Sequence, residues 1–183
     1  MAVARKVWTY EDLLDIPEDI SNRHEIIDGE LYVSPSPRVP HQRVSLNLTK
    51  FALPADEADL GRLYYAPVDV VLDEHNVFVP DLIFVAKDRL SIVQETHVHG
   101  APDLVVEILS PGTQHRDLGI KLQAYARFGV KYYWVVDLYS QSVQVFVLQD
   151  DHTFAEPRLL EGDDQLTCPL FAELGMPVSQ LFA

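Results

Sequence analysis

The most regular hydrophobic pattern of the chain lies in residues 102–137, PDLVVEILSPGTQHRDLGIKLQAYARFGVKYYWVVD. Residues 103–109 are short, apolar and rich in Val, Leu and Ile, which is typical of a buried strand. Residues 114–128 carry apolar side chains at helical spacing, and Gly129 follows where a helix commonly ends in left-handed backbone. Residues 132–137 form the next predicted strand. The pattern therefore predicts two parallel strands joined by a helix, a crossover that is nearly always right-handed.

Two charged residues interrupt this apolar pattern. Because strand side chains alternate between faces, Glu107 shares a face with Val105 and Leu109. Lys121 falls within the apolar stripe of the predicted helix. Since a crossover helix turns its apolar face toward the sheet, we expect Glu107 and Lys121 to meet in partly buried surroundings. Burial of either charge is unfavourable unless it is paired, so the two form a structural ion pair or belong to a functional site.

The N-terminal part begins with a short helix and a β-hairpin. Residues 9–14 fit the helix, with a threonine suited to cap it. Asp28-Gly29, between short strands at residues 25–27 and 30–33, is a strong hairpin signal. Glu25 lies in the first of these strands, and from the pattern alone we expect it to be solvated.

A Pro/Ser linker then leads into an amphipathic helix predicted over residues 41–53. His41 falls in its first turn, where a capping or surface role is commoner than a catalytic one. An acidic loop is predicted at residues 54–61.

Two further strands are predicted at residues 63–72 and 77–85, with a turn at residues 73–76 between them. Asp81 follows Pro80 inside the second strand, where proline indicates an edge, a bulge or a place where pairing stops. The Pro-Asp pair recurs at residues 102–103, but too little else matches to indicate an internal repeat.

Beyond the crossover unit, the chain is predicted to be mostly β. Residues 142–148 alternate apolar and polar side chains, and residues 153–160 pair back after a turn. Residues 178–181 fit a final helical turn, and residues 87–100 fit a short helix or loop.

Composition describes an ordinary globular protein with an acidic balance. The chain of 183 residues is 48% hydrophobic and 23% charged, and its length is most simply one domain, residues 1–183. Its net charge of −14 argues against non-specific nucleic-acid binding over a broad basic surface, although a local groove or a metal-loaded site can change the sign locally. The one cysteine rules out an internal disulfide, and neither a signal peptide nor a membrane span is evident. We therefore expect a cytoplasmic protein with no membrane partner.

The charged residues on core elements suggest a site. Asp81, Glu107 and Lys121 form the central set, with Glu25 and Asp69 as outer candidates. Two converging carboxylates suit a hard cation such as Mg²⁺, which can polarise a phosphoryl oxygen and lower the pKa of a bound water. A nearby ammonium could orient that water or stabilise charge on a phosphate. Such a set is equipped for phosphodiester hydrolysis.

Four segments together resemble the Uma2 family, also known as DUF820. They are HEIIDGELYVSPSP, PDLIFV, PDLVVEILSPGT with the following D-x-x-x-K-x-x-x-Y helix, and GVKYYWVVD. The resemblance spans residues 9–182, and the combination of segments is specific although no single segment is. It implies the PD-(D/E)XK nuclease superfamily and an α/β (α+β) restriction-endonuclease-like fold, a mixed β-sheet flanked by helices with additional β-hairpins.

The resemblance also implies roles for individual residues. Asp81 and Glu107 would be metal ligands, with the backbone carbonyl of Ile108 as a third. The superfamily pattern has lysine two residues after the acid, where this chain has Leu109, so Lys121 on the following helix would replace it. Glu25 would match an additional N-terminal acid. Weaker candidates for a site role are Asp69, Gln123, Tyr125 and His41.

Two hypotheses of different classes follow. The first is an endonuclease that depends on Mg²⁺, or on Mn²⁺, and cuts DNA, with Lys121 positioning or deprotonating the attacking water. The second is a catalytically silent module for binding or assembly, in which Glu107 and Lys121 form a structural pair. Similar nucleases often dimerise to cut two strands, and the apolar residues 132–148 are the candidate interface of such a homodimer.

Overall fold

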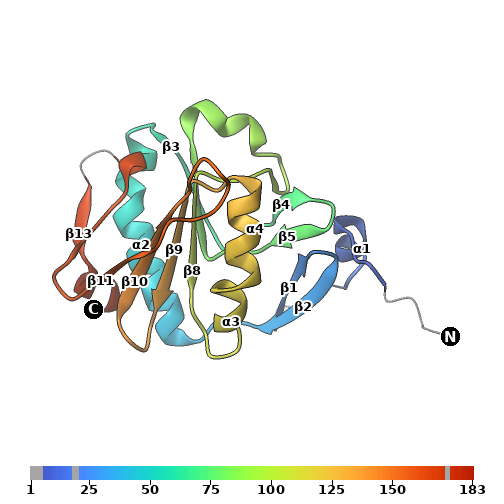
Figure 1. The fold of residues 1–183 in the computed structure, drawn as a ribbon, viewed down its shortest axis with the longest axis horizontal. Helices are drawn as coiled ribbons and strands as arrows, with labels where there is room; N and C mark the ends of the chain where they lie inside the picture. The colour runs from blue at the N-terminus through green and yellow to red at the C-terminus, as the bar shows by residue number, and fades with distance from the viewer. Residues whose placement is uncertain (1–5, 18–20, 172–173) are drawn as a thin grey trace.

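The computed structural model describes residues 6–17, 21–171 and 174–183, and its framework is two mixed β-sheets with helices packed against them (Figure 1). The larger sheet has the strand order β11 (Arg158–Glu161), β10 (Ser142–Val147), β9 (Tyr132–Asp137), β8 (Leu104–Ile108), β6 (Leu82–Ala86) and β3 (Gly61–Tyr65). The smaller sheet has the order β2 (Glu30–Pro35), β1 (Asn22–Ile27), β5 (Asn76–Phe78), β4 (Val70–Asp73) and β7 (Val98–His99).

Four α-helices and several short elements complete the described chain. The helices are α1 (Tyr10–Leu14), α2 (Val39–Glu57), α3 (Gln114–Asp117) and α4 (Ile120–Phe128). Short 3₁₀ helices span Lys87–Ile92, Pro169–Phe171 and Val178–Phe182, and β12 (Gln165–Thr167) pairs with β13 (Gly175–Pro177). None of the helices in the described residues is both apolar enough and long enough to span a bilayer.

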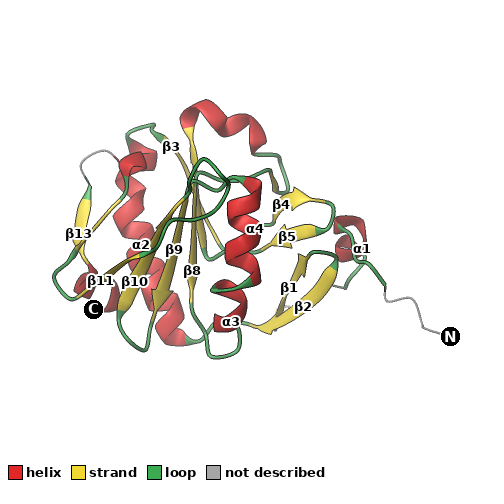
Figure 2. Cartoon of the chain, viewed as in Figure 1, coloured by secondary structure: helices red, strands yellow, loops and turns green. Residues whose placement is uncertain are grey.

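The predicted crossover unit is confirmed: β8 and β9 are parallel neighbours joined through α3 and α4. The alternation along β8 decides what each face contacts. Val105 packs in the core that contains α4, whereas Leu104 and Val106 pack in the core beneath α2. Both faces of the larger sheet are therefore covered, and Figure 2 shows α2 and α4 on either side of its central strands.

The two strands predicted at residues 63–72 and 77–85 are each broken in two, which corrects the prediction. The first becomes β3 and β4, and the second becomes β5 and β6, with one piece of each in each sheet. The breaks fall at Pro67 and Pro80, whose nitrogens have no hydrogen to donate to a strand ladder. Because pairing stops at Pro80, Asp81 lies where the chain passes from one sheet to the other.

The helix predicted over residues 114–128 is also interrupted, since α3 ends at Asp117 and α4 begins at Ile120. Gly119 occupies the break. A Cβ there would lie 2.6 Å from the His115 carbonyl oxygen, so close an approach requires glycine. Gly129 ends α4 with φ +90°, as predicted. α2 runs from Val39 to Glu57, so the helix extends beyond the predicted residues 41–53 and takes in the first part of the acidic loop predicted at residues 54–61.

The hairpin at Asp28-Gly29 is confirmed, with φ values of 49° and 76° at the two turn residues. The homodimer interface suggested at residues 132–148 stays a prediction. β9 lies between β8 and β10, and β10 is paired on both edges, so most of this segment is buried in the chain's own sheet.

Candidate active site

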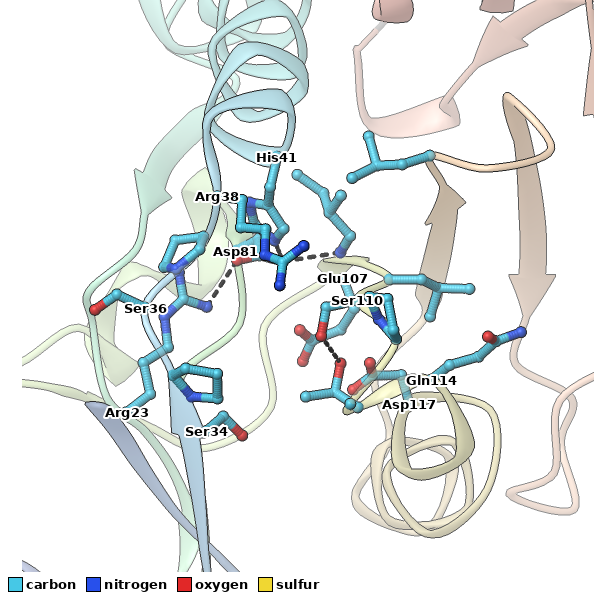
Figure 3. Close-up of a pocket in the computed structure, with 18 of the residues that line it drawn as sticks. Arg23, Ser34, Ser36, Arg38, His41, Asp81, Glu107, Ser110, Gln114 and Asp117 are labelled. Carbon is cyan, nitrogen blue, oxygen red and sulfur yellow. Dashed lines mark hydrogen bonds and ion pairs between the residues drawn. The ribbon is translucent and has the colours of Figure 1, made fainter. Parts of the chain in front are cut away.

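A cavity of about 690 Å³ lies where the hairpin β1–β2, the start of α2, the end of β8 and the α3–α4 segment meet (Figure 3). The residues proposed from the sequence that line it are Glu25, His41, Asp81, Glu107, Ile108 and Lys121. They come from five different segments of the chain. The fold therefore brings to one place residues that the sequence separates by up to 96 positions, the difference between 121 and 25.

Lys121 lies at the centre of a cluster of three acids, Glu25, Glu107 and Asp117, on one wall of the cavity. Its Nζ lies 2.8 Å from Glu25 Oε1, 3.0 Å from Glu107 Oε1 and 3.3 Å from Asp117 Oδ1. The side chain is almost fully buried, because α4 turns the stripe containing it toward β8. The predicted meeting of Glu107 and Lys121 is confirmed, and the ammonium is shared among three acids rather than paired with one.

The expectation that Glu25 is a solvated hairpin residue is wrong. Glu25 is only 4% exposed, since β1 is covered on its far edge by β5 and faces α4. Its Oε1 accepts the Val79 backbone N–H at 3.1 Å in addition to the contact with Lys121. The hairpin pattern did not reveal the second neighbouring strand, which comes from residues 76–78.

Burial sets the protonation of this cluster. Desolvation raises the pKa of Glu107 well above its ordinary value; Lys121 opposes the shift, and the charges of Asp117, Asp81 and Glu25 add to it. Desolvation alone would lower the pKa of Lys121, but Glu107, Glu25 and Asp117 outweigh it and raise that pKa well above its ordinary value. Burial likewise raises the pKa of Asp117. Three acids around one ammonium leave an excess of negative charge, which favours the approach of a further cation.

Asp81 is held in the ionised state by a separate set of contacts. Oδ1 accepts Arg23 Nη1 at 2.8 Å, while Oδ2 accepts the Ile108 backbone N–H at 2.8 Å and lies 3.1 Å from His41 Nε2. Burial opposes ionisation, but His41 and Arg23 outweigh it and lower the pKa of Asp81. A surface or capping role for His41 was the wrong expectation, because the imidazole is buried against this carboxylate.

Two members of the site were missed from the sequence, although both had a signal. Arg23 lies two residues before Glu25 on β1 and so shares its face. Asp117 lies four residues before Lys121, the spacing at which helical side chains meet.

The weaker candidates have different outcomes. Tyr125 is buried behind the cavity wall, and its hydroxyl donates to Glu107 Oε1 at 2.9 Å. Asp69 is half-buried before β4, beside His97, and does not line the cavity. Gln123 is exposed on α4. The structure therefore removes Asp69 and Gln123 from the site.

The donor chemistry of the cavity fits a hard divalent cation. No three His, Cys, Asp or Glu residues in the described part of the chain are arranged to hold a metal by themselves. Both hydrogen bonds to Glu107 go to Oε1, and Asp117 Oδ1 is a buried oxygen without a hydrogen-bond donor. Mg²⁺ commonly uses one or two carboxylates and completes its shell with water and substrate phosphate, which matches an incomplete oxygen-rich set of this kind.

Comparison with known proteins identifies relatives of this fold. The model of the Uma2 family, described as "Putative restriction endonuclease", matches residues 10–179. A crystal structure described as "a putative nuclease belonging to DUF820", from Anabaena variabilis, superposes with a TM-score of 0.79 and 21% identity, covering 95% of this chain and 97% of that one. The α+β restriction-endonuclease-like fold is thereby confirmed.

A second solved structure, the type IIG restriction endonuclease BpuSI, gives a TM-score of 0.42 at 14% identity, covering 78% of this chain and 15% of that one. A likeness this weak carries no argument. No curated protein matches the sequence.

Proposed function

This chain belongs to the Uma2 family of restriction-endonuclease-like nucleases, and we propose that it is an endonuclease that hydrolyses phosphodiester bonds of DNA with Mg²⁺ or Mn²⁺. The observation that carries the proposal is the convergence of Asp81, Glu107 and Lys121 on one cavity from three separate segments of the chain. All three are at most 4% exposed, and so concentrated a set of buried charges is typical of a functional site.

In the proposed site, Asp81 and Glu107 hold the metal ion, and the carbonyl of Ile108 is an additional ligand. The ion, when bound, polarises a phosphoryl oxygen and lowers the pKa of a bound water. Arg23 and His41 keep Asp81 ionised and in place. Burial and the neighbouring acids raise the pKa of Glu107, and the positive charge of a metal ion held there would oppose that rise.

We assign to Lys121 the role that the superfamily pattern gives to a lysine two residues after Glu107. The residue at that place, Leu109, is buried in the core shared with α4. Because the raised pKa of Lys121 keeps its ammonium protonated, we assign it to orienting the attacking water and stabilising charge on the phosphate rather than to removing a proton. Glu25 and Asp117 are positioning residues that hold the ammonium beside Glu107.

The experiment is cleavage of plasmid DNA with and without Mg²⁺ or Mn²⁺ by wild type, Asp81→Ala and Glu107→Ala. We expect metal-dependent cleavage by the wild type and none by either variant. The matched control is Asp103→Asn, the acid of the second Pro-Asp pair, which lies outside the cavity and pairs with Arg89 and Lys131. Full activity in both alanine variants would refute the proposal.

The silent-module hypothesis has one observation in its favour, namely that Lys121 is already satisfied by three carboxylates. If that network exists only for stability, removing the charge of Glu107 should weaken the fold. If the acid serves a metal, relief of carboxylate repulsion should leave the metal-free fold unharmed.

A further inference from the structure

Tyr139 is an unusual residue at the rim of the cavity. It lines the cavity, yet it is 99% exposed, so its ring has almost no packing partner. Its backbone is nevertheless well fixed in the turn between β9 and β10. The Asp137 carboxylate accepts the N–H groups of Tyr139 at 2.7 Å and Ser140 at 3.3 Å, and Gln141 closes the turn with φ 54°. The fold therefore fixes the backbone of Tyr139 at the rim of the cavity and leaves its ring unpacked and open to a ligand.

Arg38 lines the same cavity from the residue that precedes α2. Figure 3 shows Arg38 among the labelled residues that line the cavity, and its side chain is exposed. Arg23 and Lys121 both contact carboxylates, whereas no described residue forms an ion pair or hydrogen bond with the Arg38 side chain. Arg38 is therefore free to bind an anion, and arginine suits the two oxygens of a phosphate group.

The charge of the chain limits how a nucleic acid can be held. Duplex-binding proteins gain affinity by neutralising many backbone phosphates with lysine and arginine. This chain carries a net charge of −14. The proposed catalytic acids lie in a cavity of about 690 Å³, within the size range of sites that enclose a small ligand. Single strands are commonly bound by aromatic side chains that stack on their bases together with cationic contacts to their phosphates, and Tyr139 and Arg38 offer one of each at this cavity.

We propose that Arg38 and Tyr139 hold one unpaired nucleotide beside the scissile phosphate, with Arg38 on its phosphate and Tyr139 stacked on its base. This inference rests on the proposed nuclease function and narrows its substrate to single-stranded DNA, including single-stranded segments of longer molecules. A base inside a duplex is stacked on both sides and cannot offer its face to Tyr139 without leaving the helix.

The test measures binding without cleavage. A short fluorescent oligonucleotide, single-stranded or paired with its complement, is titrated with protein in EDTA at several NaCl concentrations, and anisotropy gives the Kd. The variants are Tyr139→Ala, Tyr139→Phe and Arg38→Gln. The matched control is Arg43→Gln, an exposed arginine on α2 that does not line the cavity.

We expect the single strand to bind more tightly than the duplex. Tyr139→Ala should weaken its binding by about five- to hundred-fold, and Tyr139→Phe should retain it because the ring remains. Arg38→Gln should reduce the slope of log K against log salt by about 0.7, the value for one phosphate contact on a single strand. Tyr139→Ala should leave that slope unchanged, and Arg43→Gln should leave both quantities unchanged.

The proposed function and this inference fail in different ways. If the wild type cleaves no DNA with either metal, the nuclease proposal fails. If it cleaves DNA but binds the duplex as tightly as the single strand, or if Tyr139→Ala binds like the wild type, the single-strand assignment is overturned. Cleavage without measurable binding of either oligonucleotide overturns it as well.

Discussion

Replacing Lys121 with methionine isolates the role of the ammonium in the buried acidic cluster. Methionine keeps an unbranched apolar stem of similar length, so packing between α4 and β8 is largely retained. The change removes the cation that lies within 3.3 Å of Glu25, Glu107 and Asp117. All three acids are at most 4% exposed, so little of their lost pairing can be replaced by bulk water.

The loss of unfolding free energy expected for Lys121→Met depends on the hydrogen bonds that each acid retains. Glu25 retains the Val79 N–H and Glu107 retains the Tyr125 hydroxyl, but Asp117 Oδ1 has no hydrogen-bond donor of its own. Removing one partner of a buried ion pair costs about 3–5 kcal/mol. This is a large part of the roughly 5–15 kcal/mol by which proteins are stable. With a urea dependence of about 2.5 kcal/mol/M, the unfolding midpoint should fall by about 1–2 M.

Urea denaturation at a series of pH values tests the reasoning. A carboxyl group whose pKa is raised in the folded state contributes stability below its unfolded pKa and loses it as pH rises through the folded pKa. Without Lys121, the pKa values of Glu107 and Asp117, already raised by burial, should rise further. The deficit of Lys121→Met should therefore be largest near neutral pH and shrink toward about pH 5. A deficit below about 1 kcal/mol, or one that grows on acidification, would refute the argument.

Three other outcomes are expected. Glu107→Gln should lower the unfolding free energy of the metal-free protein by less than about 1 kcal/mol, or raise it, because the amide oxygen still accepts from Lys121 while one negative charge is lost. A loss of several kcal/mol in urea denaturation would favour the structural role of the pair instead. Asp103→Asn should destabilise the protein by about 1–3 kcal/mol, since this fully buried acid binds Arg89, yet leave the cleavage rate per folded molecule unchanged; a large loss of that rate would place Asp103 in the site. Mn²⁺ affinity measured by calorimetry should rise with pH through the raised pKa of Glu107, because the metal requires the ionised carboxylate; a flat profile from about pH 5 to 9 would exclude Glu107 as a ligand.

The crossover unit could be predicted from the sequence because its signals are local. The alternation of side chains along β8 indicates that Glu107 faces the crossover helix. Helical spacing indicates that Lys121 faces the sheet, and Gly129 indicates where α4 ends. The contact between Glu107 and Lys121 follows from these three facts alone. Gly119 was the local signal overlooked, since its close approach to the His115 carbonyl separates α3 from α4.

The remainder of the site depends on contacts between distant segments. The local sequence around Glu25 and His41 predicts a solvated and a capping residue. Glu25 is buried because β5 packs beside β1, and His41 is buried because α2 packs beside Asp81. The two Pro-Asp pairs are alike in sequence but differ in surroundings. Asp81 lies where the chain passes between the two sheets and lines the cavity, whereas Asp103 accepts the backbone N–H of Ala86 at the end of β6 and pairs with Arg89 and Lys131. Periodicity carries no information on such long-range neighbours.

The most direct test of the central claim is a calorimetric titration of Mg²⁺ and Mn²⁺ into the wild type and Glu107→Gln. The glutamine keeps the hydrogen bonds of Glu107 with Lys121 and Tyr125 but cannot supply the negative charge that a hard cation requires. Metal binding by the wild type that is lost in Glu107→Gln is the predicted result. Equal heats in both proteins would contradict a carboxylate metal site at Asp81 and Glu107.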